Sequence, residues 1–307
     1  MHLPDGFISV PVAVSTGILS GGVLWVSLRK STSSYGSRYA STLGLTTAFI
    51  FAAQMINFPV LGGTSGHLLG GGLAGALLGC PWSAILSIST VLIIQAVLFA
   101  DGGITALGAN ILTMGIVSVW MSWVISRTLL LLFGGSKKYL PLACGIGSGV
   151  SVLGTSLACG IILAISGTSK ASIVIPSMAG IHLFIGVGEG VITGSILTYL
   201  VKVRPDLLSW EEDNFKGFFV PIVLIFLIAG VFSLFASALP DGLERVAQNL
   251  GFMELAKGSK NVIQIPFSKY EIIGMGQIGK STTGLLGALV CFGIAYGMAR
   301  VRLRKNA

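Results

Sequence analysis

The stretch WSAILSISTVLIIQAVLFA, residues 82–100, decides the fold class, because none of its side chains is charged. A helix of about 20 apolar residues is long enough to cross the hydrocarbon core of a bilayer. In that core only helices and closed barrels satisfy all their backbone hydrogen bonds. We therefore predict a transmembrane helix here.

The rest of the 307-residue chain has the same character. It is 53% hydrophobic and only 10% charged, and its mean hydropathy is +0.89. Soluble domains carry about 25% charged residues, so lipid must surround most of this chain. The net charge of +8 has no accompanying basic patch with interleaved aromatics. We thus predict membrane lipid as a partner and no nucleic acid.

Nine apolar segments are predicted to be membrane helices, which gives an all-α, polytopic transmembrane bundle. The third segment is short and rich in glycine, so we expect protein rather than lipid to surround it. A polar linker, Arg204 to Lys216, divides the chain into a seven-helix core, residues 1–205, and a two-helix appendix, residues 206–307. The segments are Phe7–Leu28, Ala40–Phe58, Gly66–Gly79, Trp82–Ala100, Thr105–Leu132, Leu140–Ser166, Ala171–Val201, Phe218–Ala238 and Gly279–Ala299.

The distribution of basic residues predicts the orientation of the bundle. With the N-terminus outside, 13 of the 19 lysines and arginines fall on the inner side. Cytoplasmic loops carry such an excess, so we predict an outer N-terminus and an inner C-terminus. No basic residue precedes Arg29, unlike in a signal peptide. We therefore expect Met1 to be the first residue of the mature protein.

The N-terminal Met1-His2 pair indicates metal chemistry. The α-amine of Met1, the backbone amide nitrogen of His2 and its imidazole can bind one ion through fused chelate rings. Three nitrogens in one plane suit nickel or copper better than zinc. His67, predicted on the same outer side, is the candidate fourth ligand. The alternative is a solvated His2 and a His67 that is merely hydrogen-bonded at a helix start.

Motifs through the first two thirds of the chain resemble one family. The opening MHLPDGF, residues 1–7, resembles the signature of the cobalt/nickel substrate-binding subunits of energy-coupling factor (ECF) transporters, the CbiM/NikM family. The similarity extends to about residue 205 through QMINFP (54–59), GTSGHL (63–68), DGG (101–103), LGAN (107–110) and His182 with GEG (188–190). The segment PDGLE, residues 240–244, resembles that of the small N-type (NikN/CbiN-like) accessory subunit, here fused.

The resemblance implies a substrate-specificity component of an ECF-type ABC importer. Its expected metal ligands are the Met1 amine, the His2 amide and imidazole nitrogens, and the His67 imidazole. The expected cargo is Ni²⁺, which the fusion favours, or otherwise Co²⁺. The resemblance also implies a seven-helix fold in a prokaryotic cell (inner) membrane. It further implies a coupling transmembrane subunit (CbiQ/NikQ-like) and separate ATPase subunits (CbiO/NikO-like). The chain itself is then no enzyme and binds no nucleotide.

Other polar residues within or beside the spans are further candidates. Glu189 lies within a span and could stabilise a passing cation or simply pack, and the role of His182 stays open. Asp5 and Asp101 are expected to hold the N-terminal segment in place. Residues that could orient His67 are Gln54, Asn57, Thr64 and Ser65.

Two alternative functions follow from other features. The segment Gly274–Ser281 fits the phosphate-binding pattern G-x4-G-K-S, which would suit an ATPase or another membrane enzyme. Because a predicted span rather than a soluble helix follows it, we attribute the match to chance. An ion-driven secondary carrier is the other alternative, with Glu189 as its coupling residue.

Overall fold

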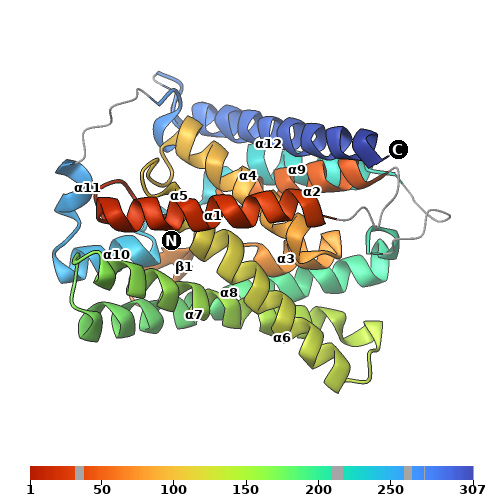
Figure 1. Ribbon diagram of the computed structural model, residues 1–307. Helices are drawn as coiled ribbons and strands as arrows, with labels where there is room; N and C mark the ends of the chain where they lie inside the picture. The colour runs from red at the N-terminus through yellow and green to blue at the C-terminus, as the bar shows by residue number, and fades with distance from the viewer. Residues whose placement is uncertain (32–37, 209–216, 259–264, 273, 307) are drawn as a thin grey trace.

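The computed structural model describes residues 1–31, 38–208, 217–258, 265–272 and 274–306. Helices make up most of these residues and strands very few, which confirms the predicted all-α class (Figure 1). The first two thirds of the chain contain α1 (Val10–Lys30), α2 (Tyr39–Gln54), α3 (Gly71–Leu78), α4 (Pro81–Phe99), α5 (Leu107–Asn110), α6 (Ser118–Leu132), α7 (Leu140–Ile165) and α8 (Ala171–Val203). The last third contains α9 (Phe219–Gly230), α10 (Gly242–Leu250), α11 (Glu254–Gly258) and α12 (Gly276–Asn306).

Short elements connect these helices. A π-helical turn, Ile111–Val117, joins α5 to α6 into one continuous rod. An antiparallel hairpin of β1 (Phe58–Val60) and β2 (Thr64–Gly66) pairs Phe58 with Gly66. Single 3-10 turns lie at Lys137–Tyr139, Pro205–Leu207, Phe232–Phe235 and Ser268–Tyr270.

Among the residues that the structure describes, six helices are long and apolar enough to cross a membrane, so the chain is a multi-pass membrane protein. The other three predicted spans are shorter than expected. The helix α2 has 16 residues, α3 has 8 and α9 has 12. The prediction of a helix from Gly66 is wrong, because the backbone becomes helical only at Gly71. Gly70 precedes it with a left-handed φ of 79°, a conformation that costs glycine little.

Close contacts between small residues hold the bundle together. At Gly145 on α7, an added Cβ would lie 2.9 Å from the carbonyl oxygen of Gly190 on α8. At Gly287 on α12, it would lie 2.1 Å from the Phe51 ring on α2. Small residues let helix backbones approach closely. The C-terminal helix therefore packs into the bundle and is not a loose addition to it.

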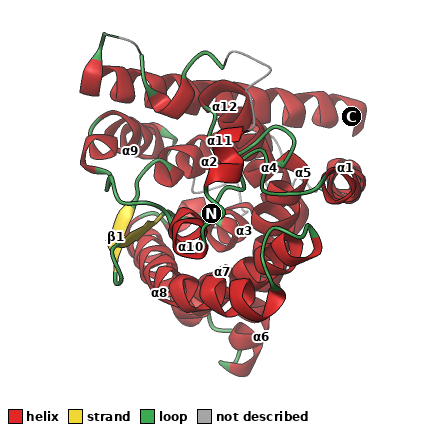
Figure 2. Cartoon of the chain, turned by 90° about the vertical axis from the view of Figure 1, so that its left-hand side faces the viewer, coloured by secondary structure: helices red, strands yellow, loops and turns green. Residues whose placement is uncertain are grey.

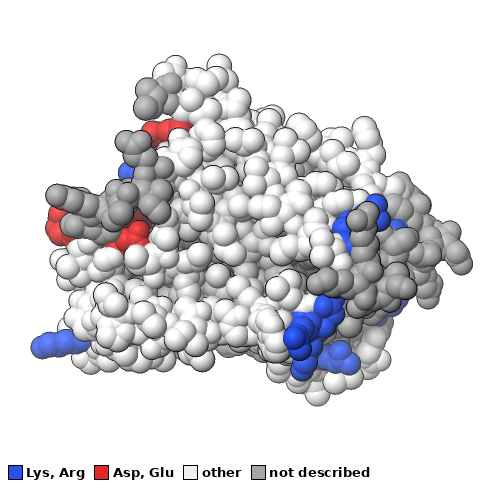
Figure 3. All heavy atoms as spheres, turned by 45° about the horizontal axis from the view of Figure 1, so that its top comes forward, with Lys and Arg blue, Asp and Glu red and all other residues white. Residues whose placement is uncertain are grey.

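Charged side chains separate along the long axis (Figure 3). On the face shown, basic residues gather mainly at the end where α1 finishes, and acidic residues lie at the opposite end. This polarity agrees with the predicted orientation, in which basic residues mark the inner side.

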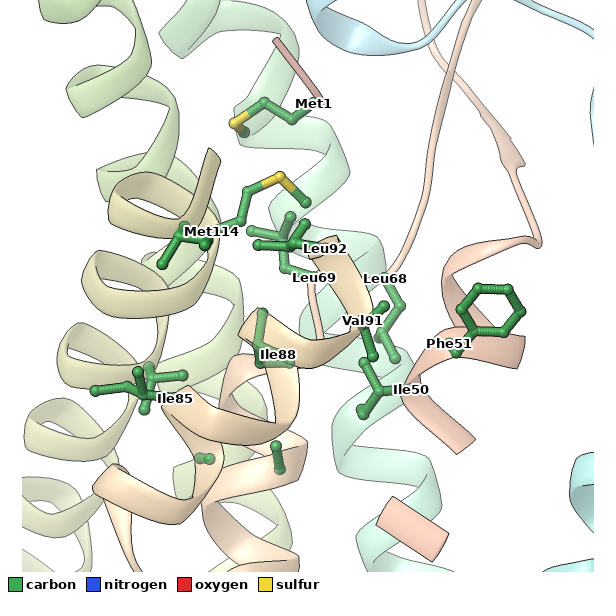
Figure 4. Packing of buried hydrophobic residues seen from close by; sticks show 14 of the residues in the cluster. Met1, Ile50, Phe51, Leu68, Leu69, Ile85, Ile88, Val91, Leu92 and Met114 are labelled. Carbon is green, nitrogen blue, oxygen red and sulfur yellow. The ribbon is translucent and has the colours of Figure 1, made fainter. Parts of the chain in front are cut away.

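The N-terminal segment enters the protein interior. Leu3 and Phe7 are fully buried and Met1 is 4% exposed. Viewed along the bundle, the N-terminus lies at the centre, beside α10 (Figure 2). The Met1 side chain lies at the upper end of a packed cluster with Leu69, Leu92 and Met114 (Figure 4). The first residue is thus part of the core.

Candidate metal centre

Three backbone contacts fix the N-terminal segment. The Leu3 N–H donates to Asn110 Oδ1 at 2.8 Å, and the Leu3 carbonyl accepts from the Asn110 amide at 3.0 Å and from Gly103 N–H at 2.8 Å. Asp5 accepts from the Thr105 N–H and hydroxyl, as expected of a residue that anchors this segment. Gly103 lies so close that an added Cβ would sit 2.3 Å from the Asp5 nitrogen.

These contacts place the Met1 amine beside His67. The amine nitrogen lies 2.7 Å from His67 Nε2 and 2.7 Å from Asp241 Oδ2. As an ammonium, it donates to both groups. The His2 and His67 rings stack with their centroids 4.9 Å apart and their planes 20° apart. Residues 66 positions apart in the sequence thus meet in one buried site.

The His2 ring has partners at both nitrogens. Nδ1 lies 3.2 Å from Asp101 Oδ1, and Nε2 lies 3.1 Å from Gln95 Oε1. Asp101 therefore contacts His2 itself, which agrees with its expected role in holding the N-terminal segment. Gln95 has no counterpart in the sequence prediction, because an uncharged residue in an apolar span gives little signal.

His67 lies in the non-helical segment between β2 and α3. Its Nδ1 lies 3.1 Å from the Leu68 carbonyl oxygen, so we assign the ring proton to Nδ1. The lone pair then sits on Nε2, which faces the Met1 amine. A hydrogen bond of this kind at one ring nitrogen commonly orients a histidine for metal binding through the other.

Glu189 on α8 holds the segment that carries His67. Its two carboxylate oxygens accept from the Leu69 N–H at 2.7 Å and the Gly70 N–H at 2.9 Å. The Gln54 amide donates to the Leu69 carbonyl at 2.9 Å. Gln54 was expected to orient His67, and the role of Glu189 was left open between a passing cation and packing. In the structure both side chains shape residues 67–70. We place neither among the metal ligands.

Burial keeps the two imidazoles in the neutral form. Removal from water lowers the pKa of His2 from its usual value. Burial, together with the N-terminal ammonium and His2, lowers the pKa of His67 well below its usual value. Neutral imidazole is the form that binds metals. His67 therefore presents a free lone pair at Nε2, whereas His2 Nδ1 faces the Asp101 carboxylate and must first give up its proton.

A small cavity of about 10 Å³ adjoins the amine, with His67, His182 and Asp241 among its lining residues. His182 directs Nδ1 to the Met178 carbonyl at 2.7 Å. Its Nε2 has no hydrogen-bond partner among the described residues. Within the same part of the chain, no three His, Cys, Asp or Glu side chains form a cluster that could hold a metal. The candidate centre thus depends on main-chain nitrogens as well as imidazoles.

Sequence reasoning missed Asp241, which belongs to the PDGLE segment. This residue begins α10 with a capping box: its Oδ1 accepts from Glu244 N–H, and Glu244 accepts from Asp241 N–H. Burial alone would raise the pKa of Asp241, but the charge of the N-terminal ammonium and its hydrogen bond hold that pKa well below its usual range. The PDGLE motif was identified by its resemblance to an accessory subunit, and that resemblance gave no indication that Asp241 contacts Met1.

Thr64 and Ser65 have a different role from the one predicted. Their hydroxyls donate to the carbonyl oxygens of Pro240 at 3.0 Å and Leu239 at 2.8 Å. The Ser65 N–H also donates to the Pro240 carbonyl at 2.9 Å. They seat the PDGLE segment over the site and make no contact with the His67 ring. Asn57 likewise contacts the C-terminal region, through its carbonyl and the Ser237 N–H.

The segment Gly274–Ser281 begins α12. The Ser281 hydroxyl donates to the Gly230 carbonyl at 2.6 Å. A phosphate-binding loop follows a strand, and residues 265–272 and 274–275 contain only a 3-10 turn and irregular backbone. The local fold therefore differs from that of a nucleotide-binding loop.

Comparison with known families decides the affiliation of the chain. The pattern of the family described as "Cobalt uptake substrate-specific transmembrane region", CbiM, matches residues 2–207. The chain belongs to the CbiM family. A second pattern, the PDGLE domain, matches residues 216–304, so this CbiM protein carries its PDGLE domain on the same chain.

Relatives of this CbiM protein are metal transport proteins. One from Archaeoglobus fulgidus, provisionally named a fused nickel transport protein, NikMN, is 31% identical over 306 residues, 98% of each chain. The fused nickel transport protein NikMN of Rhodobacter capsulatus is 34% identical, over 68% of this chain and 64% of its own. A crystal structure of a truncated transition metal transporter aligns with a TM-score of 0.59 and 34% identity, over 66% of this chain and 99% of its own. Transport is therefore the function common to the relatives, and none of these three is described as an enzyme.

Glu189 offers a test of the site's architecture. Glu189→Gln should lower the free energy of unfolding by about 1–3 kcal/mol, because the amide presents an N–H₂ group to a backbone N–H. Metal affinity should fall with it, since His67 is only two residues from Leu69. Thermal unfolding in detergent measures the first effect. Thr193→Val is the control: this buried hydroxyl on the same helix has no partner among the described residues, so the change should leave stability nearly unaltered. Equal unfolding temperatures for all three proteins would contradict the role of Glu189.

Proposed function

We propose that this CbiM protein is the substrate-specificity component of an ECF-type importer, and that it captures Ni²⁺ through four nitrogens. The ligands are the Met1 amine, the His2 backbone amide, His2 Nδ1 and His67 Nε2. The observation that carries the proposal is the distance of 2.7 Å between the buried Met1 amine and His67 Nε2.

The chelate rings determine which nitrogens must be neighbours. The Met1 amine and the His2 amide close a five-membered ring with the metal, and the amide and His2 Nδ1 close a six-membered ring. His67 then takes the corner between the amine and His2 Nδ1. With metal–nitrogen bonds of about 2.0 Å, adjacent corners of a planar site lie about 2.8 Å apart. The observed 2.7 Å fits this requirement.

One ligand must rearrange for the plane to close. His2 Nδ1 lies against Asp101 in the structure, so its ring must turn away from that carboxylate to reach the metal. The stacked rings already lie in the same pocket, so the His2 side chain needs to rotate, and the proton that Nδ1 donates to Asp101 must move to Nε2. Metal capture then replaces the hydrogen bonds of the amine and of His2 with metal–nitrogen bonds.

The four-nitrogen set favours nickel as the cargo. Ni²⁺ adopts planar nitrogen coordination more readily than Co²⁺ or Zn²⁺. Relatives named as nickel transport proteins share the fused arrangement. Co²⁺ is the second candidate, because other relatives carry the name of cobalt transport proteins.

The first test is metal content and spectrum. Purified protein with a free Met1, verified by intact mass, should bind one Ni²⁺ per chain and show the yellow, diamagnetic signature of planar nickel. Affinity should fall by about tenfold per pH unit for each proton that metal binding releases, beginning with that of the His2 amide. Since both imidazoles resist protonation, this acid sensitivity reports on the main-chain nitrogens. A paramagnetic, six-coordinate nickel would contradict the proposed ligand set.

Energy for transport comes from partner subunits under this proposal. A coupling transmembrane subunit and separate ATPases would drive uptake, with residues 1–205 as the capture domain and residues 206–307 as the accessory domain. Ni²⁺ uptake by cells should therefore require these partners in addition to this chain. Uptake by the chain alone in ATP-depleted vesicles would favour an ion-driven carrier instead.

A further inference from the structure

The C-terminal region reaches the candidate metal centre at two separate points. Asp241 Oδ2 accepts from the Met1 ammonium at 2.7 Å. Tyr270, in a 3-10 turn before α12, donates its hydroxyl to Asp101 Oδ2 at 2.7 Å, and the other oxygen of Asp101 lies 3.2 Å from His2 Nδ1. The first contact ends on a proposed ligand, the Met1 amine, and the second reaches another proposed ligand, His2, through Asp101.

The fit around Asp241 is specific. An added Cβ at Gly242 would lie 2.8 Å from His182 Nε2 and 2.8 Å from Ile185 on α8, so the PDGLE segment approaches the bundle as closely as a glycine allows. Hydrogen bonds from Thr64 and Ser65 hold the adjoining Pro240 and Leu239. Asp241 is therefore held firmly where it meets the amine.

The charge at this point favours one arrangement of the N-terminus. Met1 is almost fully buried, and an unpaired ammonium in such a place is costly. With Asp241 present, the ammonium has a counter-ion 2.7 Å away and lies next to His67 Nε2. Without it, the N-terminus would lack its charge partner and would be drawn toward water.

We propose that Asp241, supplied by the PDGLE region, is a positioning residue that holds the N-terminal amine beside His67 for metal capture, while Tyr270 sets the resting position of His2 through Asp101. The inference rests on the four-nitrogen site proposed above. It assigns the fused C-terminal region a defined task, which is to arrange the ligands before the metal arrives. When the metal takes the amine's lone pair, one proton leaves for solvent, and Asp241 loses its hydrogen-bonded partner.

The test compares two substitutions in the same capping box. Asp241→Asn retains the oxygen that caps α10 and turns an N–H₂ donor toward the ammonium. Glu244→Gln alters the other member of the box, which makes no hydrogen bond to Met1. The purified full-length proteins are mixed with NiCl₂, and the rate and affinity of binding are measured. We expect Asp241→Asn to lower both by at least about tenfold, the usual effect of losing a partner of a metal ligand. Glu244→Gln should stay within about twofold of wild type.

A second readout needs no metal. In the metal-free protein, the Met1 amine should react faster with an amine-acylating reagent in Asp241→Asn than in wild type or Glu244→Gln, as peptide mass spectrometry would show. Asp241→Glu should partly restore the wild-type rates of labelling and capture. Tyr270→Phe should weaken Ni²⁺ binding without accelerating the labelling of Met1, because its contact leads to His2.

The outcomes separate this inference from the proposed function. Equal labelling and equal Ni²⁺ capture in Asp241→Asn and wild type would overturn the inference, as would faster labelling with unchanged capture. If wild-type protein binds no nickel at all, the four-nitrogen site itself fails. Faster labelling of the variant would then show only that Asp241 positions the N-terminus. Similar losses in Asp241→Asn and Glu244→Gln would indicate a damaged cap and would also overturn the inference.

Discussion

His67→Ala should abolish high-affinity nickel binding, lowering it by at least about 10³-fold, while the protein still folds. Removing one of four ligands opens the planar site, and the alanine offers no nitrogen at the corner beside the Met1 amine. The amine would also lose its hydrogen bond to Nε2 but keep Asp241. Loss of a ligand should lower metal affinity more than the tenfold to hundredfold that follows when a group hydrogen-bonded to a ligand is lost. Isothermal titration with NiCl₂ and uptake of radioactive nickel by cells measure the two consequences.

His182→Ala is the matched control for this substitution. His182 is equally buried and lines the same cavity, so its removal creates a comparable vacancy in the core. It is not among the proposed ligands, and nickel binding should therefore survive within about tenfold. Full binding by His67→Ala, or a loss as large in His182→Ala, would refute the proposed ligand set.

Extending the N-terminus by one alanine should have an effect as large as the loss of His67. The extension moves the α-amine by one residue, about 3.8 Å along the chain, and turns the Met1 nitrogen into an amide. The buried ion pair with Asp241 would then be lost. The added amine would no longer lie beside His67. It could chelate nickel with two backbone amides and the His2 imidazole, but such an ion would be held without His67, outside the proposed site, and should not be transported.

The experiment needs proteins that differ only at this terminus. The extended chain and the wild type are expressed with the same C-terminal tag, and intact mass verifies that the added residue is retained. An alanine inserted in the exposed turn at Gly134-Gly135, where added side chains would meet open space, controls for chain lengthening. Normal uptake of radioactive nickel by the N-terminally extended protein, together with nickel binding that still requires His67, would rule out ligation by the amine.

Much of the fold could be predicted because lipid imposes a simple rule on sequence. Long uncharged runs must be helices, and helices occupy all the predicted segments. The errors lie where protein rather than lipid surrounds the chain. At residues 67–70, the side chains of Glu189 and Gln54 satisfy backbone groups, so the chain can remain non-helical there. A helix that protein surrounds also needs less length, as α3 shows with its 8 residues.

The candidate site likewise combines features that the sequence predicts with features that only the structure shows. The ligand types were readable from the sequence, because an N-terminal Met1-His2 carries its chelating nitrogens within two adjacent residues. His67 could be nominated by residue type and by the family motif. The orientation of the His67 ring could not be predicted, because it depends on Glu189, which is 120 positions from Leu69 along the chain. Gln95 and Tyr270 also could not be predicted as neighbours of the site, because their positions depend on the packing of α4 against the C-terminal region.

The sequence alone therefore determined the membrane environment, the helical class and the chemical identity of the candidate metal-binding groups, since each depends on local composition or on neighbouring residues. Tertiary structure decided what surrounds those groups. It brought Asp241 from the far end of the chain to within 2.7 Å of the first nitrogen. The reason is physical: a buried charge must have a partner, and only the folded backbone determines which of the available carboxylates lies within reach.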